Sequence, residues 1–306
     1  MNKIAFDLSV LLEKNQYKSK IVSSKNLSLL IKKIQDYYYK GFIEENFFKE
    51  RLSWIKKDLL ENHQDAKSII IVAVPRPQTT ATFIFKGSIK TLIIPPTYSG
   101  YEQIEEKIES LIKKTLERQN YSIKKAVIPL KILATRSGLA EYGKNNICYV
   151  SGMGSFLQLV AFYSNLPSEE PLQKPKIMGI CTGCNLCHIV CPTKAISSKR
   201  FLLYAERCLT YHNEKKGEIP FPDWIEKKWH NCIVGCMYCQ KICPENQKFR
   251  NWFGLGEIFS EKETIALLAK SDVNDLESST LDKLKRLNLA DYIDSLSRNL
   301  NVFFSQ

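Results

Sequence analysis

Cysteine is the residue type whose spacing most clearly predicts chemistry in this chain. Ten cysteines occur among its 306 residues, and nine of them lie between residues 177 and 250. The first run follows the spacing C-x2-C-x2-C-x3-C-P and consists of Cys181, Cys184, Cys187, Cys191 and Pro192. Three thiolates separated by two residues can bind three corners of one 4Fe-4S cube, with Gly183 easing the turn between them, while the fourth cysteine points to a second cube.

The second cysteine run predicts that two clusters exchange ligands. It keeps C-x2-C-x3-C-P but places its first cysteine four residues before the next, and it consists of Cys232, Cys236, Cys239, Cys243 and Pro244. Two such runs are typical of bacterial ferredoxins with two 4Fe-4S clusters. One cluster is expected to be bound by Cys181, Cys184, Cys187 and Cys243. The other is expected to be bound by Cys191, Cys236 and Cys239, with either Cys208 or Cys232 as its fourth ligand.

Structural zinc is the alternative to iron-sulfur clusters. Zinc sites use isolated C-x2-C pairs separated by a loop and do not need the C-x3-C-P ending, so the pattern favours two cubes. The tenth cysteine, Cys148, lies in an apolar stretch and is expected to be a buried free thiol. His188 lies inside the first run, where cysteines supply all the ligands, so we expect it to pack beside a cluster.

Composition and charge describe the environment in which these cysteines work. The chain lacks 18 uninterrupted apolar residues and an N-terminal secretory pattern, so we expect a cytoplasmic protein with no membrane association and with reduced thiols. Its net charge is +12; because residues 251–306 hold six basic and nine acidic side chains, the first 250 residues carry +15. A basic surface favours an anionic partner, such as nucleic acid or an acidic electron-transfer protein. A solvated lysine-rich surface explains the charge equally well.

The hydrophobic pattern predicts the elements that position the cysteines. Strands that alternate with helices before residue 166 indicate an α/β arrangement, and Pro167, Pro171 and Pro175 mark a linker after it. The chain then continues into the cysteine-rich segment and a helical tail. The expected elements are helices over 4–60, 100–118 and 152–164, a buried strand over 68–74, a hairpin over 80–94, a short strand over 126–129, and helices beyond 259.

Beyond the cysteines, several motifs resemble the epoxyqueuosine reductase family. Residues 136–145 are similar to that family's R-A-G-L-G-W-I-G-K-N segment, and residues 154–156 to its G-S-W/F step. Glu206, Arg207 and Cys208 resemble its isolated R-C element. Residues 235–246 are similar to G-C-D-x-C-Q-x-V-C-P-x-N, and residues 298–300 to R-N-L. The resemblance therefore runs over most of the chain.

The resemblance implies an α+β fold in three parts. A nitroreductase-like α/β domain over residues 1–166 binds cobalamin, a double 4Fe-4S ferredoxin-like domain follows over 177–250, and a helical segment occupies 251–306. The implied cofactors are two 4Fe-4S clusters and one cobalamin, which the clusters reduce so that it can act on a substrate carbon. The resemblance also favours Cys208 as the eighth cluster ligand and leaves Cys232 as an additional thiol.

The resemblance further implies which residues bind the corrinoid. Glycines permit close backbone approach to a large flat ligand, although ordinary turns use them too. The residues implied are Gly138, Gly143, Lys144, Asn145, Gly154 and Ser155.

One departure from the family concerns the proton donor. The family has an aspartate shortly before the arginine of R-A-G-L-G, but residues 124–131 here contain no carboxylate. Proton delivery needs a titratable group within hydrogen-bond reach of the substrate. The replacement candidates are Glu141, Tyr142 and Lys144.

Two functions from different classes follow from these observations. The first is a cobalamin-dependent iron-sulfur reductase with an altered substrate, which receives electrons from a donor such as ferredoxin or flavodoxin. The second is a non-catalytic 4Fe-4S electron-transfer protein that reduces a partner such as a corrinoid protein. The missing carboxylate favours the second function, whereas the retained Gly-Lys-Asn loop and the α/β domain favour the first. Binding of tRNA rests on charge alone.

Overall fold

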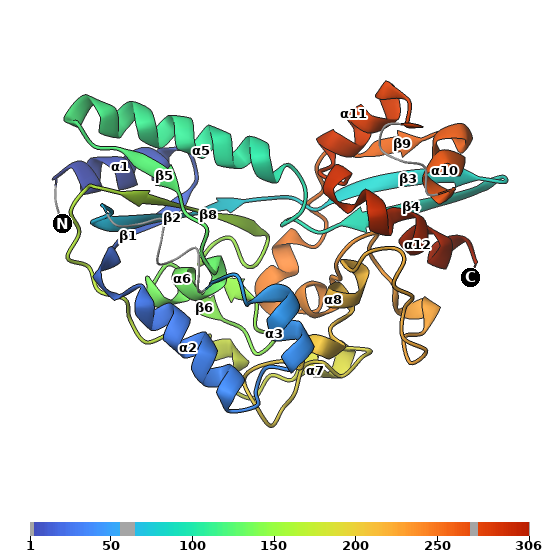
Figure 1. The fold of residues 1–306 in the computed structure, drawn as a ribbon, viewed down its shortest axis with the longest axis horizontal. Coiled ribbons are helices and arrows are strands. Elements are labelled where there is room, and N and C mark those ends of the chain that lie inside the picture. The colour runs from blue at the N-terminus through green and yellow to red at the C-terminus, as the bar shows by residue number, and fades with distance from the viewer. Residues whose placement is uncertain (1–2, 56–64, 270–274, 306) are drawn as a thin grey trace. The chain divides into compact units, whose positions relative to one another are not determined.

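The chain folds into two compact units that interleave along the sequence. The computed structural model describes residues 3–55, 65–269 and 275–305. The first unit consists of Met1–Pro75, Glu102–Asn185 and Ser198–Ala205, and the second of Arg76–Tyr101, Leu186–Ser197 and Glu206–Gln306. The architecture is a mixture of helices and sheets, as expected for an α+β protein (Figure 1).

A four-stranded antiparallel sheet forms the centre of the first unit. Its strand order is β1-β2-β8-β5, with bounds Lys18–Ser23, Ser68–Pro75, Leu157–Ser164 and Ile123–Lys125. The two central strands, β2 and β8, are buried along almost their whole length. Strands that are covered on both faces need apolar residues at consecutive positions, which explains the uninterrupted run Ile69–Ile70–Ile71–Val72.

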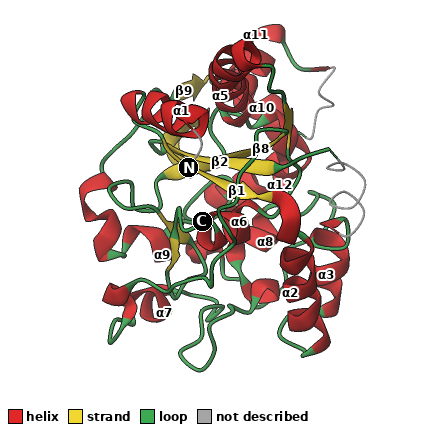
Figure 2. Ribbon diagram, turned by 90° about the vertical axis from the view of Figure 1, so that its left-hand side faces the viewer, coloured by secondary structure: helices red, strands yellow, loops and turns green. Residues whose placement is uncertain are grey.

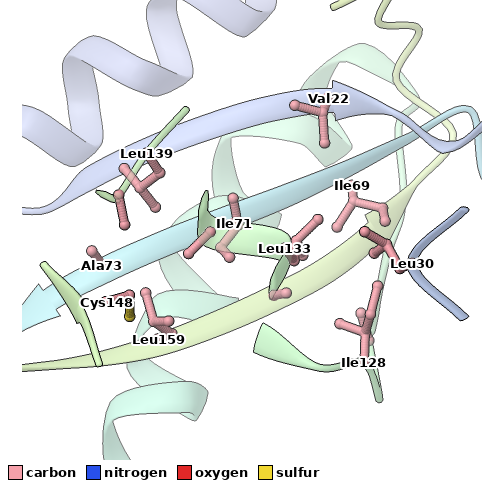
Figure 3. Close-up of a cluster of buried hydrophobic side chains, with 14 of the residues drawn as sticks. Val22, Leu30, Ile69, Ile71, Ala73, Ile128, Leu133, Leu139, Cys148 and Leu159 are labelled. Atoms are coloured by element: carbon pink, nitrogen blue, oxygen red, sulfur yellow. The ribbon is translucent and has the colours of Figure 1, made fainter. Parts of the chain in front are cut away.

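Helices cover both faces of this sheet, as Figure 1 shows. Helices α1 and α5 lie on one face, and α2 and α6 on the other (Figure 1). A large core forms beneath α2 and α6 from side chains of β2 and β8, among them Ile71 and Leu159, together with Leu30 and Leu133 (Figure 3). The bounds of the helices are Lys3–Lys14 for α1, Ser28–Tyr39 for α2, Glu45–Arg51 for α3, Tyr101–Leu116 for α5 and Leu130–Arg136 for α6.

Three sequence expectations for the first unit were wrong. The helix expected over residues 152–164 is instead strand β8, which pairs with β2 and β5 and is buried at every position. A strand covered on both faces needs no alternation of apolar and polar residues, so its sequence resembles that of a buried helix. The expected helical region 4–60 is interrupted by strand β1, which pairs with β2. The short strand lies at Ile123–Lys125 rather than 126–129. The expectation for residues 56–60 falls outside the described residues.

The second unit is built on a three-stranded sheet of order β4-β3-β9. Strands β3 (Thr79–Phe85) and β4 (Ser88–Ile94) form the predicted hairpin, whose turn residues Lys86 and Gly87 both have positive φ. Strand β9 (Glu257–Phe259) pairs parallel to β3, and the Phe83 and Phe259 rings stack with centroids 4.8 Å apart. Helices α10 (Glu261–Leu268), α11 (Ser278–Arg286) and α12 (Ile293–Phe304) pack into the same core, which confirms the helical tail.

The cysteine-rich part of the second unit contains short helices joined by loops, visible as green segments in Figure 2. The helices are α7 (Leu186–Val190), α8 (Leu209–Asn213) and α9 (Tyr238–Lys241). Ile233 and Val234, close to Cys236 in sequence, are fully buried in the core formed by the hairpin and the C-terminal helices. This core therefore anchors the second cysteine run. No helix in the described ranges combines the length and apolar character needed to cross a bilayer.

The start of α10 is fixed by a carboxylate with several partners. Ser260 and Glu263 form a capping box, and Glu263 also accepts hydrogen bonds from Lys283 at 2.8 Å and Thr280 at 3.2 Å. Burial alone would raise the pKa of Glu263, but the hydrogen bonds from Lys283 and Ser260 outweigh it and hold the pKa below its ordinary value of 4.5. The ionised form of Glu263 therefore stabilises the folded protein.

We expect Glu263→Gln to destabilise the protein by about 1–2 kcal/mol at pH 7, because a neutral amide replaces the carboxylate that accepts charge-assisted hydrogen bonds from Lys283 and Ser260, although glutamine can still complete the capping box. Since the folded pKa lies below 4.5, this contribution is complete above pH 4.5 and disappears as the pH falls through the folded pKa. Melting temperatures of the two proteins should therefore converge in acid. Glu277→Gln, which alters only an exposed ion pair with Lys262, is the control and should change little. An equal loss for both variants would contradict the assignment.

Candidate metal centre

The second unit brings cysteines from both runs into one group. Cys191 lies with Ala195 and Ile196 in a small buried cluster, against which Cys187, Cys208 and Cys239 pack. Helices α7 and α9, which carry Cys187 and Cys239, also contact each other. The two runs therefore meet in space although about 50 residues separate them, an arrangement that exchange of ligands between two cubes requires.

Partial burial changes the acidity of the thiols in this part of the second unit; Cys191 is buried, whereas Cys208, Cys236 and Cys239 are partly buried residues. Burial raises the pKa of Cys236 to about 12 and that of Cys239 well above its ordinary value. Burial also raises the pKa of Cys208, opposed by hydrogen bonds from Thr210. Because metal binds the thiolate, loading such a site must displace protons, and the bound form supplies the charge compensation that the buried thiolates need.

The sulfur donors of this group are of the kind that 4Fe-4S cubes use. In the described ranges, no three His, Cys, Asp or Glu side chains converge closely enough to hold one metal ion. A 4Fe-4S cube does not need such convergence, since each thiolate binds a different iron. Burial, thiol chemistry and the grouping of cysteines from two runs are all compatible with cubes.

Cys208 and Cys232 occupy different surroundings. Cys208 packs with the group around Ala195 and Ile196. Cys232 is fully buried where its backbone forms a bridge with Ile93 of the hairpin, and its thiol donates a hydrogen bond to Asn231 Oδ1 at 3.0 Å. Both cysteines interact electrostatically with Cys236. Cys208 contributes to raising the pKa of Cys236, and Cys236 contributes to raising the pKa of Cys232.

Cys181 and Cys184 belong to the first unit, where they form a tight turn. Cys184 N donates to Cys181 O at 3.3 Å, and Gly183 between them has φ +78°, which a residue with a side chain adopts only with strain. Lys144 Nζ donates to Cys184 O at 2.8 Å and to Asn185 Oδ1 at 3.2 Å. Lys144, a candidate acid, is therefore tied to the backbone of the first cysteine run.

The other two candidate acids lie on opposite sides of a short hairpin. Strands β6 (Glu141–Tyr142) and β7 (Cys148–Tyr149) pair so that Glu141 is exposed and Tyr142 is buried. Burial raises the pKa of Tyr142 to about 12, although a hydrogen bond with Thr135 opposes the shift. Tyr142 is therefore a neutral phenol at physiological pH. Cys148 is a buried thiol in the core of the first unit, as expected (Figure 3).

The predicted corrinoid-binding residues have local structural roles. A Cβ at Gly143 would lie 2.5 Å from Asn145 Oδ1 and 2.7 Å from the Tyr149 ring, so packing alone requires glycine there. Asn145 is buried and donates to Tyr149 Oη at 2.9 Å. Gly138 has φ +74° directly after α6, and Gly154 has φ +57° in a turn that bridges to Val150. Ser155 is buried after that turn. Contact with a corrinoid remains a prediction for all of them.

A clamp from helix α12 holds the loop that follows Cys208. The Arg298 guanidinium donates to the carbonyl oxygens of five residues, at distances from 2.6 to 3.4 Å, and lies 4.2 Å from the Phe221 ring centroid. Asn299 Nδ2 donates to Asn213 O and Ile233 O, both at 2.9 Å. The five carbonyls belong to His212, Asn213, Lys215, Lys216 and Ile219. The R-N-L motif at residues 298–300 resembles the family's sequence, but its pattern alone indicates no role for Arg298 and Asn299.

Comparison with known proteins identifies the class of the cysteine-rich segment. Residues 180–246 match the family model described as a 4Fe-4S double cluster binding domain. The chain is therefore an iron-sulfur protein with two 4Fe-4S sites. This match favours cubes over the zinc alternative.

More particularly, the chain is similar to epoxyqueuosine reductases in sequence and in fold. It is 30% identical over 165 residues to the epoxyqueuosine reductase of Atelocyanobacterium thalassa, covering 51% of this chain and 52% of that protein. It is 32% identical over 207 residues to that of Prochlorococcus marinus, covering 64% of each. The chain thus aligns with less than two thirds of the length of these relatives.

Solved structures show the same fold. The epoxyqueuosine reductase from Streptococcus thermophilus superposes with a TM-score of 0.68 at 20% identity, covering 98% of this chain and 80% of that one. An epoxyqueuosine reductase bound to an epoxyqueuosine-modified tRNA stem loop gives a TM-score of 0.66, also at 20% identity, with 98% and 81% covered. The mixed fold expected from the sequence is confirmed.

We expect Arg298→Lys to accelerate loss of iron from the reconstituted protein, because an ammonium cannot replace a planar guanidinium that donates to several carbonyls at once. About half of the iron should become labile, because the loop that Arg298 holds follows Cys208, which is expected to bind only one of the two cubes. Chelation by a coloured ferrous chelator, followed over time, measures the effect. Arg286→Lys, which alters the ion pair of an exposed arginine with Glu257, is the matched control. Identical iron-loss rates for both variants would remove the proposed role of the clamp.

Proposed function

We propose that this protein is a cobalamin-dependent iron-sulfur reductase related to epoxyqueuosine reductases but acting on a different substrate. The observation that carries the proposal is the grouping of Cys187, Cys191, Cys208 and Cys239 from separate parts of a double 4Fe-4S segment. Two clusters in series transfer electrons one at a time. A plain ferredoxin needs only about a quarter of this chain, so the first unit, with its own sheet and core, is expected to serve an acceptor.

The proposed ligands divide the cysteines between two cubes. Surroundings favour Cys208 over Cys232, because Cys208 packs with the cysteine group whereas the Cys232 thiol is turned toward Asn231. One cube is assigned to Cys181, Cys184, Cys187 and Cys243. The other cube is assigned to Cys191, Cys208, Cys236 and Cys239.

The proposed acceptor is a corrinoid, which when bound supplies low-valent cobalt chemistry that side chains cannot perform. The resemblance in the segment from Arg136 to Asn145 supports this assignment. Within that segment, Lys144 holds the turn of the first cysteine run through Cys184 O, so it links the predicted corrinoid loop to a predicted cluster ligand. Gly138, Gly154 and Ser155 would complete the loop surface.

The substrate is proposed to differ from that of the relatives because the proton donor differs. The Bacillus subtilis epoxyqueuosine reductase has a catalytic loop that carries an aspartate. In this chain the corresponding stretch lacks a carboxylate, and its Lys125 forms an ion pair with Glu105 of α5. Of the three candidate donors, Tyr142 is protonated and buried, Glu141 faces solvent, and Lys144 is engaged by backbone oxygen. We therefore propose Tyr142 as the donor.

The proposed partners follow from charge and from the relatives. An acidic ferredoxin or flavodoxin suits the basic chain as electron donor, and a solved relative binds a tRNA stem loop, so a nucleic acid is the proposed substrate class. A cytoplasmic location is proposed because reduced thiols are needed to assemble the clusters.

A second function is favoured by the same missing carboxylate. A chain that keeps two clusters but has no acid at the family position would work as an electron-transfer protein, reducing a partner such as a corrinoid protein. The two functions differ in whether this chain itself binds cobalamin.

Titration of the reconstituted protein with cobalamin separates the two functions. We expect about eight irons per chain, four for each cube, and binding of cob(II)alamin in the base-off form. Iron analysis, visible absorption and EPR spectroscopy of the anaerobic protein measure both quantities. Eight irons without any corrinoid binding would exclude the reductase and leave electron transfer. A content well below eight irons would contradict the two-cluster assignment itself.

Substitution of single cysteines tests the ligand assignment. Cys208→Ala should lose one cluster, because only three of the four thiolates that this cube needs would remain. The variant should therefore retain about four irons, those of the other cube. Cys232→Ala should retain about eight irons. Cys148→Ala, which removes a buried thiol from the core of the first unit, is the matched control and should also retain about eight. Loss of a cluster in Cys232→Ala, with retention in Cys208→Ala, would reverse the choice of ligand.

A further inference from the structure

One side chain in the second unit contacts the sulfur of a proposed cluster ligand. Asn231 Nδ2 lies 3.2 Å from Cys236 Sγ and 3.4 Å from Trp229 O. Asn231 Oδ1 lies 2.9 Å from the backbone nitrogen of Met237 and 3.0 Å from Cys232 Sγ. The amide is therefore surrounded by partners on both its oxygen and its nitrogen side.

The partners fix which way the amide points. A backbone N–H can only donate, so the amide atom that faces Met237 must be the oxygen. The NH2 group is then the part that faces Cys236 Sγ, where it donates to sulfur. Trp229 O agrees with this orientation, because a carbonyl oxygen can only accept.

The Cys232 thiol adds a second donor to the same amide oxygen. Cys232 is fully buried, and its thiol donates to Asn231 Oδ1 at 3.0 Å. Its backbone is held by the bridge to Ile93. The Met237 N–H and the Cys232 S–H both donate to Asn231 Oδ1. If the amide were rotated by 180°, its NH2 group would face these two donors and could accept from neither.

We propose that Asn231, oriented by Cys232, is a positioning residue that raises the reduction potential of the cluster bound by Cys236. The inference rests on the proposed ligand role of Cys236. Reduction adds one electron to an already negative cube, with no bond broken and no proton taken up. A hydrogen bond to a ligand sulfur stabilises the added charge more than it stabilises the oxidised cube, so it favours the reduced form. Cys232 then acts through Asn231 rather than through iron.

This role also explains why the chain has Cys232, a cysteine that is not among the eight proposed cluster ligands. A small, buried, weakly donating side chain fits the space between Asn231 and the hairpin, and the thiol satisfies the amide oxygen without introducing a charge. The extra cysteine is therefore part of the environment of the cluster, although it supplies no ligand.

A redox titration of the reconstituted full chain, monitored by EPR, tests the proposal. Asn231→Leu removes the donor without changing charge, and Asn231→Asp removes it while keeping an acceptor for Met237 N–H. Each should lower one of the two midpoint potentials by the equivalent of a tenfold change in the ratio of reduced to oxidised cluster, about 59 mV for one electron. The second potential should stay unchanged. Asn301→Asp, on the exposed side of α12, makes the same charge change and should move neither potential.

Cys232 variants keep the test decisive if an Asn231 variant loses iron. Cys232→Ala removes the S–H donor and should lower the same potential by less than the Asn231 variants do, whereas Cys232→Ser keeps a donor and should match the unaltered protein. Unchanged potentials in Cys232→Ala and in every Asn231 variant that retains eight irons would overturn the inference while leaving the two-cluster assignment standing. An unaltered protein that assembles no clusters would overturn both.

Discussion

The meeting of two cysteine runs that are distant in sequence is the constraint on which the second unit depends. Each cube that exchanges ligands needs thiolates from both runs, yet the helices that carry them, α7 and α9, have only five and four residues. Helices this short do not hold their own shape in water. The hairpin β3–β4 and the C-terminal helices supply the missing rigidity through a common core that includes Ile233 and Val234.

Helix α12 shows how a distant element supports the site. Arg298 and Asn299 satisfy backbone oxygens of the loop after Cys208 and of Ile233, which lies just before Cys236. Burial lowers the pKa of Arg298 to about 10, which still leaves the guanidinium charged at neutral pH. The carbonyl oxygens of His212, Asn213 and Lys215, whose bonds to Arg298 are partly buried, therefore accept from a fixed, planar donor. Removal of that donor would cost these hydrogen bonds.

The surroundings of the cysteines distinguish between residues that their spacing in the sequence does not. Cys208 and Cys232 were equivalent by spacing, and they differ in what surrounds them: one packs with other cysteines, and the other donates to an asparagine. Likewise Glu141 and Tyr142 are neighbours in sequence, but pairing of β6 with β7 exposes one and buries the other. A strand turns alternate side chains to opposite faces, so adjacent residues receive opposite environments.

The sequence by itself determined the cofactor chemistry, the hairpin, the buried strand β2 and the helical tail, because cysteine spacing, turn glycines and apolar periodicity are local signals. It did not determine β8, whose continuous apolar run suits a buried helix or a buried strand equally well until its partners are known. Nor did it show that residues 76–101 belong to the second unit, with Cys187 and the cysteines after it, although the chain on both sides of them belongs to the first. Tertiary structure decided these points, and the contacts of Asn231, Arg298 and Lys144, because each depends on residues brought together only by folding.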